Sequence, residues 1–168
     1  MSRIVRRVRQ AEIYFITTDT WQRRQLFAKP EPARIVVEHI LECRERGFYK
    51  LHSFVLMPEH LHMLITPGDQ TTLEKAVMMI KGGSSYQIKK QLPYSFPIWM
   101  EGFHDRWIRD VHEYRIRKQY IEQNPVKARL AEVPDQYLLG SASGRYQLDR
   151  CAFDGGTSAA KAAATNAS

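Results

Sequence analysis

The pattern of hydrophobic and polar positions along the chain predicts strands that alternate with helices. Three stretches are rich in β-branched and aromatic residues and are typical of strands: residues 11–17, 51–57 and 60–66. Two stretches carry apolar side chains at three- and four-residue intervals, which predicts helices: residues 32–47 and 73–91. Pro58 and Glu59 leave a tight connection between the last two strands, so we expect an antiparallel hairpin there.

The second half of the chain predicts a loop and further helices. Residues 93–102 indicate a loop with a short strand around Ile98 and Trp99. Apolar positions across residues 105–123 predict a helix. We expect it to stop at Asn124, because a residue before proline avoids the α conformation, and a short helix to follow over residues 126–130.

These elements predict an α+β fold, a ferredoxin-like sandwich with a mostly antiparallel sheet flanked by helices. Residues 1–150 form the expected domain. Residues 151–168 are dominated by Gly, Ala, Ser and Thr, and such a segment buries too little apolar area to offset its ordering entropy. We therefore expect a disordered Ala/Ser-rich tail. The pair Gly82 and Gly83 predicts a weak point or a bend inside its helix.

Charge narrows the class of partner. The chain has 25 Lys and Arg against 18 Asp and Glu, a net charge of +7. This balance favours a polyanionic partner, with nucleic acid ahead of an acidic membrane surface. The apolar runs are too short to span a bilayer, and the basic N-terminus is not followed by the apolar stretch of a secretory signal, so we expect a cytoplasmic protein with no membrane partner. Two cysteines give no thiolate metal site.

His60 and His62 stand two residues apart in a predicted strand. Side chains of a strand alternate between its faces, so both imidazoles are expected to point the same way. Such a pair can bind one divalent cation, and either ring can instead carry a proton. The alternative is a half-exposed strand that shows two polar side chains to solvent.

Tyr120 and Asn124 are spaced four residues apart, which places them on the same face of a helix. The Asn124 carboxamide oxygen is a candidate third ligand for a hard cation. A phenol beside such a cation can attack a phosphate, which would give a covalent phosphotyrosine. Two structural explanations remain open: Tyr120 as part of the core, and Asn124 as the N-cap of a following helix.

The histidine and tyrosine segments belong to a longer ordered set of motifs: residues 14–17, 21–24, 55–62, 81–86, 98–105 and 120–128. With these motifs, residues 11 to about 145 resemble the single-tyrosine transposases of the His-hydrophobic-His nuclease superfamily. More narrowly, the chain resembles the branch associated with repetitive extragenic palindromes (REP).

The resemblance implies metal-dependent cleavage and rejoining of single-stranded DNA through a 5′-phosphotyrosine. Tyr120 matches the nucleophile, and His60 and His62 match the ligands of Mg²⁺ or Mn²⁺. Asn124 matches the third ligand, where insertion-sequence relatives carry glutamine, and Gln123 is one place off. The chain departs from the family at position 59, where Glu replaces Asn, and at residues 138–141, where the family has a Trp-Ser-Ser stretch.

The implied partners are single-stranded DNA and DNA hairpins, bound by a monomer or a homodimer. Such binding combines backbone electrostatics with base stacking. The candidate phosphate contacts are Arg23, Arg24, Lys81, Lys89, Arg106 and Arg109, and the candidate stacking residues are Trp21, Phe103 and Trp107. Solvated charges and core aromatics are the alternatives. Two other functions stay open: a hairpin-DNA binder without catalysis, and an RNA-binding ferredoxin-like protein.

Overall fold

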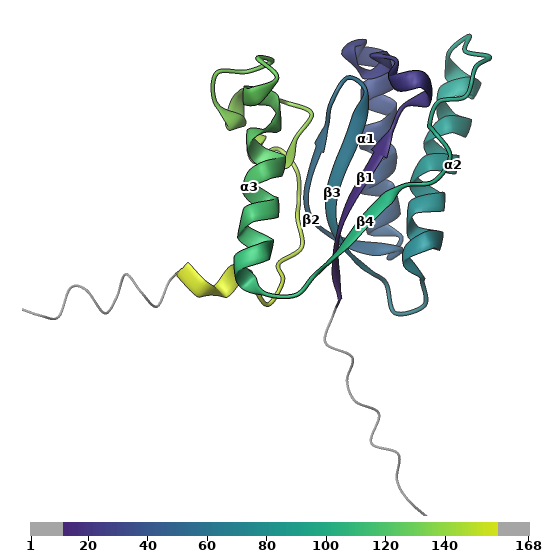
Figure 1. The fold of residues 1–168 in the computed structure, drawn as a ribbon. Coiled ribbons are helices and arrows are strands. Elements are labelled where there is room, and N and C mark those ends of the chain that lie inside the picture. The colour runs from purple at the N-terminus through teal and green to yellow at the C-terminus, as the bar shows by residue number, and fades with distance from the viewer. Residues whose placement is uncertain (1–11, 158–168) are drawn as a thin grey trace, which may run out of the picture.

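The computed structural model describes residues 12–157 and contains four strands and three α-helices in this part of the chain. The strands are β1 (Ile13–Asp19), β2 (Tyr49–Leu56), β3 (His60–Pro67) and β4 (His104–Ile108). The helices are α1 (Pro30–Glu45), α2 (Leu73–Gln91) and α3 (Val111–Lys127) (Figure 1).

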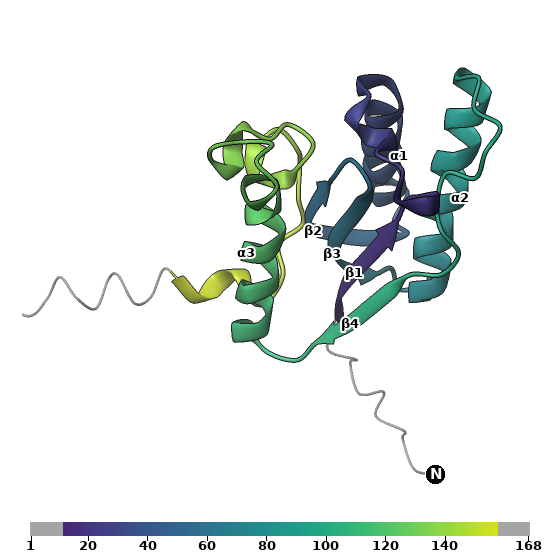
Figure 2. The same ribbon diagram turned by 45° about the horizontal axis from the view of Figure 1, so that its top comes forward.

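The strands form one sheet in the order β2-β3-β1-β4, and each neighbouring pair is antiparallel. Helices α1 and α2 cover one face of the sheet, and α3 lies against the other (Figures 1 and 2). The predicted α+β, ferredoxin-like sandwich is confirmed. The β2–β3 hairpin is confirmed as well, with its turn at Pro58 and Glu59.

The central strand β3 contributes side chains to both faces of the sheet, because successive side chains of a strand point to opposite sides. Leu61, Met63 and Ile65 enter the main core, which lies between the sheet and helices α1 and α2. Leu64 enters a smaller second core with Tyr114 of α3. The histidines of β3 share the α3 face with Leu64, since they are separated from it by even numbers of residues.

The two glycines of α2 do not bend the helix, which runs unbroken from Leu73 to Gln91. Gly83 is needed for a close approach between helices. A Cβ atom at this position would lie 2.1 Å from Nε2 of His39 on α1, and that nitrogen makes a 2.9 Å hydrogen bond to the carbonyl of Met79. The predicted bend was therefore wrong. The glycine at position 83 allows α1 and α2 to pack closely instead.

The predicted helix over residues 105–123 was wrong at its N-terminal end. Residues His104 to Ile108 form β4, which pairs with β1. The sequence obscures this strand because four of its five side chains are exposed. These residues have only a weak local preference for a strand. Pairing with β1 and burial of Ile108 stabilise the strand nevertheless. Helix α3 begins after Asp110, whose side chain caps it by accepting a hydrogen bond from the Glu113 N–H (2.8 Å).

The expected stop at Asn124 was also wrong, because α3 continues through Pro125 to Lys127. A proline inside a helix removes one main-chain hydrogen bond. Here it falls in the last turn, and its buried ring lies on the side facing the protein. The separate helix expected over residues 126–130 does not form. The short strand expected near Trp99 does not form either, and Trp99 makes only a single β-bridge, to Thr20.

The chain beyond α3 returns along the outer edge of β2 (Figure 1). The Leu56 N–H donates to the Leu139 carbonyl (2.8 Å), and the Asp149 N–H donates to the Leu51 carbonyl (2.7 Å). The Asp149 carboxylate also accepts two 2.8 Å hydrogen bonds from the guanidinium of Arg44 on α1. This edge of the sheet is therefore covered by the protein's own C-terminal segment.

The first residues of the expected tail, after residue 150, contact α3 in the structure. The Asp154 carboxylate accepts a hydrogen bond from the Tyr114 hydroxyl (3.1 Å) and forms an ion pair with Lys118 (3.6 Å). The start of the expected tail thus packs on α3. The rest of it, residues 158–168, lies outside the described residues, as do residues 1–11. Among the described helices, none is long and apolar enough to cross a membrane.

The fit between Gly83 and His39 predicts a strong difference between two adjacent glycines. Gly83→Ala should lower the free energy of unfolding by about 1–3 kcal/mol, because the new methyl group collides with a buried imidazole. Gly82→Ala meets nothing within 4 Å and should be neutral or stabilising, by up to about 1 kcal/mol. Urea denaturation measures both values. Equal stability of the two variants would contradict the packing described here.

Candidate active site

His60 and His62 lie side by side on the α3 face of β3. Their ring centroids are 4.5 Å apart. The His62 side chain is buried, and the His60 side chain is 12% exposed at the end of the strand. The same-face arrangement predicted from their spacing is therefore present in the fold.

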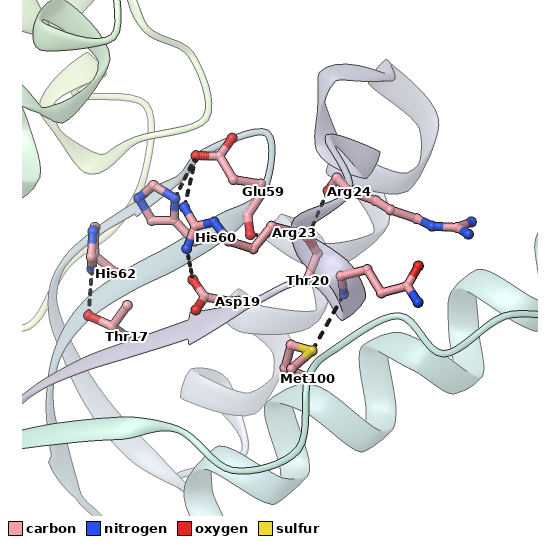
Figure 3. A network of polar contacts seen from close by, with 10 residues as sticks. Thr17, Asp19, Thr20, Arg23, Arg24, Glu59, His60, His62 and Met100 are labelled. Atoms are coloured by element: carbon pink, nitrogen blue, oxygen red, sulfur yellow. Dashed lines mark hydrogen bonds and ion pairs between the residues drawn. The ribbon is translucent and has the colours of Figure 1, made fainter.

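A partner holds the Nδ1 atom of each ring (Figure 3). His60 Nδ1 lies 2.9 Å from a carboxylate oxygen of Glu59, to which it donates. His62 Nδ1 lies 2.7 Å from the hydroxyl of Thr17, its cross-strand neighbour on β1. These contacts fix the orientation of both rings and leave the Nε2 atoms for another ligand, an arrangement typical of metal-binding histidines.

The environment of His62 strongly favours the neutral imidazole. Burial is the largest cause and lowers the pKa of His62 to about 3. The positive charges of His60, Arg117 and Arg23 act in the same direction. A neutral ring retains the lone pair that a metal or a proton would use.

Tyr120 reaches this pair of histidines from α3. Its ring centroid is 5.2 Å from that of His62, with the planes at 68°. Both rings also contact Phe15 of β1, at 6.0 Å from Tyr120 and 5.3 Å from His62. The Tyr120 side chain remains 38% exposed, so a solvent-borne substrate can reach it.

Asn124 lies one helical turn after Tyr120 on α3, and both residues share a helix face. Within residues 12–157 its carboxamide makes no hydrogen bond to another side chain, and it is partly buried. The neighbouring Gln123 points elsewhere on the helix. The same part of the chain contains no group of three or more His, Cys, Asp or Glu able to hold a metal. A third ligand from this part of the protein would therefore be of another residue type, and the Asn124 carboxamide is the candidate.

Two of the predicted phosphate contacts are engaged within the protein near this site. Arg23 forms ion pairs with Asp19 (2.9 Å) and Glu59 (3.6 Å), and so supports the turn that carries His60 (Figure 3). Lys81 donates to two carbonyls of the loop before β4, one of them that of Met100 (2.6 Å). Partial burial also lowers the pKa of Lys81.

Arg106 and Arg109 lie at the other end of the α3 face. Both contact the Glu113 carboxylate, which also accepts the main-chain N–H of Arg109 (3.1 Å). Their charges are thus partly compensated by one acidic residue. Contacts from either arginine to DNA stay a prediction.

The remaining DNA-binding candidates differ in exposure. The Arg24 guanidinium lies 4.8 Å from the Trp21 ring and 4.6 Å from the Phe96 ring, on the surface. Lys89 is exposed in the last turn of α2, and Trp107 is 52% exposed on β4 beside a cavity of about 380 Å³. Phe103 is partly buried against the main core, which suits packing better than base stacking.

The structure adds residues to the site that the sequence did not assign to it. Glu59, noted as a departure in a turn, orients His60. His104 pairs with Thr17 across β1 and β4, and so lies in the same row of the sheet as His62. Arg117 lies over Phe15, with its guanidinium carbon 5.0 Å from the ring centroid. The sequence could have indicated this residue, because Arg117 stands three residues before Tyr120 and so lies on the same face of the helix.

The chain is similar to known proteins in both sequence and fold. A sequence model of the family described as "Transposase IS200 like" matches residues 9–124. The fold is similar to a REP-associated tyrosine transposase bound to a REP hairpin, with a TM-score of 0.67 and 22% identity over 90% of this chain and 92% of that chain. It is also similar to a candidate transposase from Deinococcus radiodurans R1, with a TM-score of 0.51 and 20% identity over 66% and 88%. No curated protein sequence matches the chain.

The buried state of His62 predicts a pH-dependent stability in metal-free buffer. The unfolded chain binds a proton at this imidazole near pH 6.5, whereas the folded chain resists protonation down to about pH 3. Above pH 6.5 the free energy of unfolding is therefore unaffected by His62. Below it, stability falls as the pH drops, by up to about 1.4 kcal/mol per pH unit.

His62→Asn should remove this contribution. Urea denaturation with EDTA at pH 7.5, 6.5 and 5.5 compares the two proteins. The wild-type protein should lose more stability than the variant between pH 6.5 and 5.5. Parallel pH profiles would show that His62 is protonated as readily in the folded as in the unfolded protein.

Proposed function

Because the chain belongs to the IS200-like transposase family, we propose that it cleaves and rejoins single-stranded DNA with Tyr120 as nucleophile and a divalent metal ion at His60 and His62. One observation carries the proposal. The Tyr120 ring, 38% exposed, contacts His62, whose ring lies 4.5 Å from that of His60. A nucleophile and two imidazoles with available Nε2 atoms thus meet on one open face.

The donor set fits a divalent cation. Glu59 engages Nδ1 of His60, which leaves Nε2 of that ring for a metal, and burial favours the neutral form of His62. Asn124 would add an oxygen from the same helix face as Tyr120. Two imidazoles with an amide oxygen, completed by phosphate and water oxygens, suit Mn²⁺ or Mg²⁺. The bound ion would supply Lewis-acid polarisation of the phosphate.

The reaction exchanges one phosphodiester for another. The Tyr120 phenol oxygen forms a bond to phosphorus, and the bond from phosphorus to the 3′ oxygen breaks. The phenol proton leaves through solvent, and the departing 3′ oxygen gains a proton to become a 3′-OH. The 5′ phosphate stays on Tyr120 as a phosphotyrosine, whose attack by a 3′-OH would rejoin the strand.

The proposed substrate is single-stranded DNA next to a hairpin. The net charge of +7 favours a polyanion, and the surface aromatic Trp21 with Arg24 suits stacking beside a phosphate backbone. The structurally similar REP-associated transposase is bound to a REP hairpin. A folded palindrome with single-stranded flanks is therefore the first substrate to test.

We infer that one chain carries a whole site. Tyr120 contacts His62 of its own chain, and α3 is fixed beside the sheet by the second core. The C-terminal segment also follows the edge of β2, where another sheet could otherwise pair. A monomer is sufficient for the proposed chemistry.

A covalent adduct should form on Tyr120. We expect a labelled single-stranded palindrome with Mn²⁺ or Mg²⁺ to give a denaturation-resistant protein–DNA species, and peptide mapping should place the nucleotide on Tyr120. Tyr120→Phe should abolish the adduct yet bind DNA within about twofold of wild type, because it removes one hydroxyl and no charge. Tyr86→Phe is the matched control, since Tyr86 is 63% exposed on α2, across the sheet, and should leave the adduct unchanged.

Two results would contradict this mechanism. Cleavage that persists in Tyr120→Phe would show that water or another residue attacks the phosphate. Tight DNA binding by the wild-type protein without any adduct, across Mn²⁺ and Mg²⁺, would favour a hairpin-binding protein without catalysis.

A mixing experiment tests whether the site lies within one chain. We expect an equimolar mixture of Tyr120→Phe and the double variant His60→Ala, His62→Ala to form no adduct, because each chain lacks one half of its own site. Gel assays of the adduct, at concentrations up to those used for the wild type, measure this. Recovery of activity in the mixture would show that two chains exchange α3 and share their sites.

A further inference from the structure

The nucleophile lies between two basic side chains of its own helix. Arg117 is three residues before Tyr120, and its guanidinium carbon is 5.0 Å from the centroid of Phe15, the ring that contacts both Tyr120 and His62. Lys127 is seven residues after Tyr120, and its ammonium nitrogen is 5.6 Å from the centroid of the Tyr120 ring. Spacings of three and seven keep all three side chains on one stripe of α3.

Neither cation has an acidic partner in the part of the chain that the structure describes. Within residues 12–157, no carboxylate lies within 4.0 Å of Arg117 or Lys127, and the segments outside that range contain no Asp or Glu. Several other cations near this face are compensated: Arg23 by Asp19 and Glu59, Arg106 and Arg109 by Glu113, and Lys118 by Asp154. Two uncompensated charges therefore remain beside the phenol.

We propose that Arg117 and Lys127 form the binding site for the DNA phosphate that Tyr120 attacks, an inference that rests on the proposed function. Arg117 presents a planar fork that can donate two hydrogen bonds to the non-bridging oxygens of one phosphate. Lys127 acts as a point charge on the other side of the phenol. Both charges lie where negative charge gathers during phosphoryl transfer, and the stacking of Arg117 on Phe15 sets the fork in place before DNA arrives.

Packing alone offers a second explanation for Arg117, because its stem and guanidinium cover Phe15. The two roles respond differently to substitution. Arg117→Met keeps an unbranched apolar cover over Phe15 and removes the charge, so a packing role predicts little change in any property. A phosphate-binding role predicts a loss of DNA affinity at unchanged stability.

The test measures binding without chemistry. In a Tyr120→Phe background with EDTA, fluorescence anisotropy follows a labelled hairpin with single-stranded flanks at several salt concentrations. Arg117→Met and Lys127→Met should each weaken binding by roughly tenfold. Each should also lower the slope of log affinity against log salt by about 0.7, the value for one phosphate of a single strand. Arg115→Met is the matched control, since Arg115 is exposed on α3 and lies about 200° around the helix from Arg117.

Replacing single phosphates of the DNA by uncharged methylphosphonates identifies the phosphate that Arg117 contacts. A methylphosphonate is placed at each position of the flank in turn, and one position should cost the Tyr120→Phe protein roughly tenfold in affinity. The same replacement should cost the Arg117→Met protein clearly less, because one of the two charges that bind this phosphate is already absent. That position should also be the one at which the wild-type protein forms its adduct.

Three outcomes would overturn the inference: Arg117→Met binding like Arg115→Met, methylphosphonate effects that are the same with and without Arg117, and a thermal stability loss that accounts for weaker binding. The proposed function fails separately. If the wild-type protein forms no adduct while the phosphate contact is found, the site binds DNA without cleaving it. If the adduct forms while Arg117→Met binds normally, only the assignment of Arg117 and Lys127 is lost.

Discussion

The register of β3 within the sheet is the constraint on which the site depends. β3 lies between β2 and β1, and its pairing places His62 opposite Thr17 and His60 opposite Asp19. Because strand side chains alternate, this register sends Leu61 into the main core and both imidazoles to the α3 face. A slip of one residue would expose the apolar side chains and bury the histidines on the wrong side, so the stability of the core also fixes the position of the site.

Helix α3 places Tyr120, the proposed nucleophile, beside the histidine pair. The second core holds its inner side through Tyr114 and Ile121, and Asp154 secures Tyr114 from the C-terminal segment. Tyr120 lies next to Ile121, at the margin of this core, where it contacts His62 and still meets solvent. Rigid packing on one side and exposure on the other suit the role proposed for Tyr120, a nucleophile that acts on a large substrate.

Much of the fold was predictable because the hairpin and α2 have strong local patterns. The apolar runs on both sides of Pro58 and Glu59 identified two strands and their turn, and the histidine spacing gave their common face. β4 was missed since an edge strand with exposed, charged side chains has no alternation to detect, although its pairing with β1 stabilises it. The Asp110 and Glu113 pair was the overlooked signal for the true start of α3.

The site was predictable only in part, for a similar reason. The histidine and tyrosine motifs are local in sequence, and the contact between His62 and Tyr120 agrees with the arrangement expected of them. Whether a carboxylate compensates the charge of a basic residue depends on the fold. Arg23 and Arg106 meet carboxylates that no motif indicates, while Arg117, which no motif singled out, meets none among residues 12–157.

The central claim is that His60, His62 and Tyr120 form one metal-dependent site for DNA cleavage. Anomalous diffraction from crystals of the Tyr120→Phe protein with Mn²⁺ and a single-stranded palindrome tests it most directly. The account predicts one manganese peak bonded to the Nε2 atoms of both histidines and to a phosphate oxygen beside residue 120. Manganese bound elsewhere, or DNA positioned at Tyr120 with the histidines free of metal at saturating Mn²⁺, would contradict it.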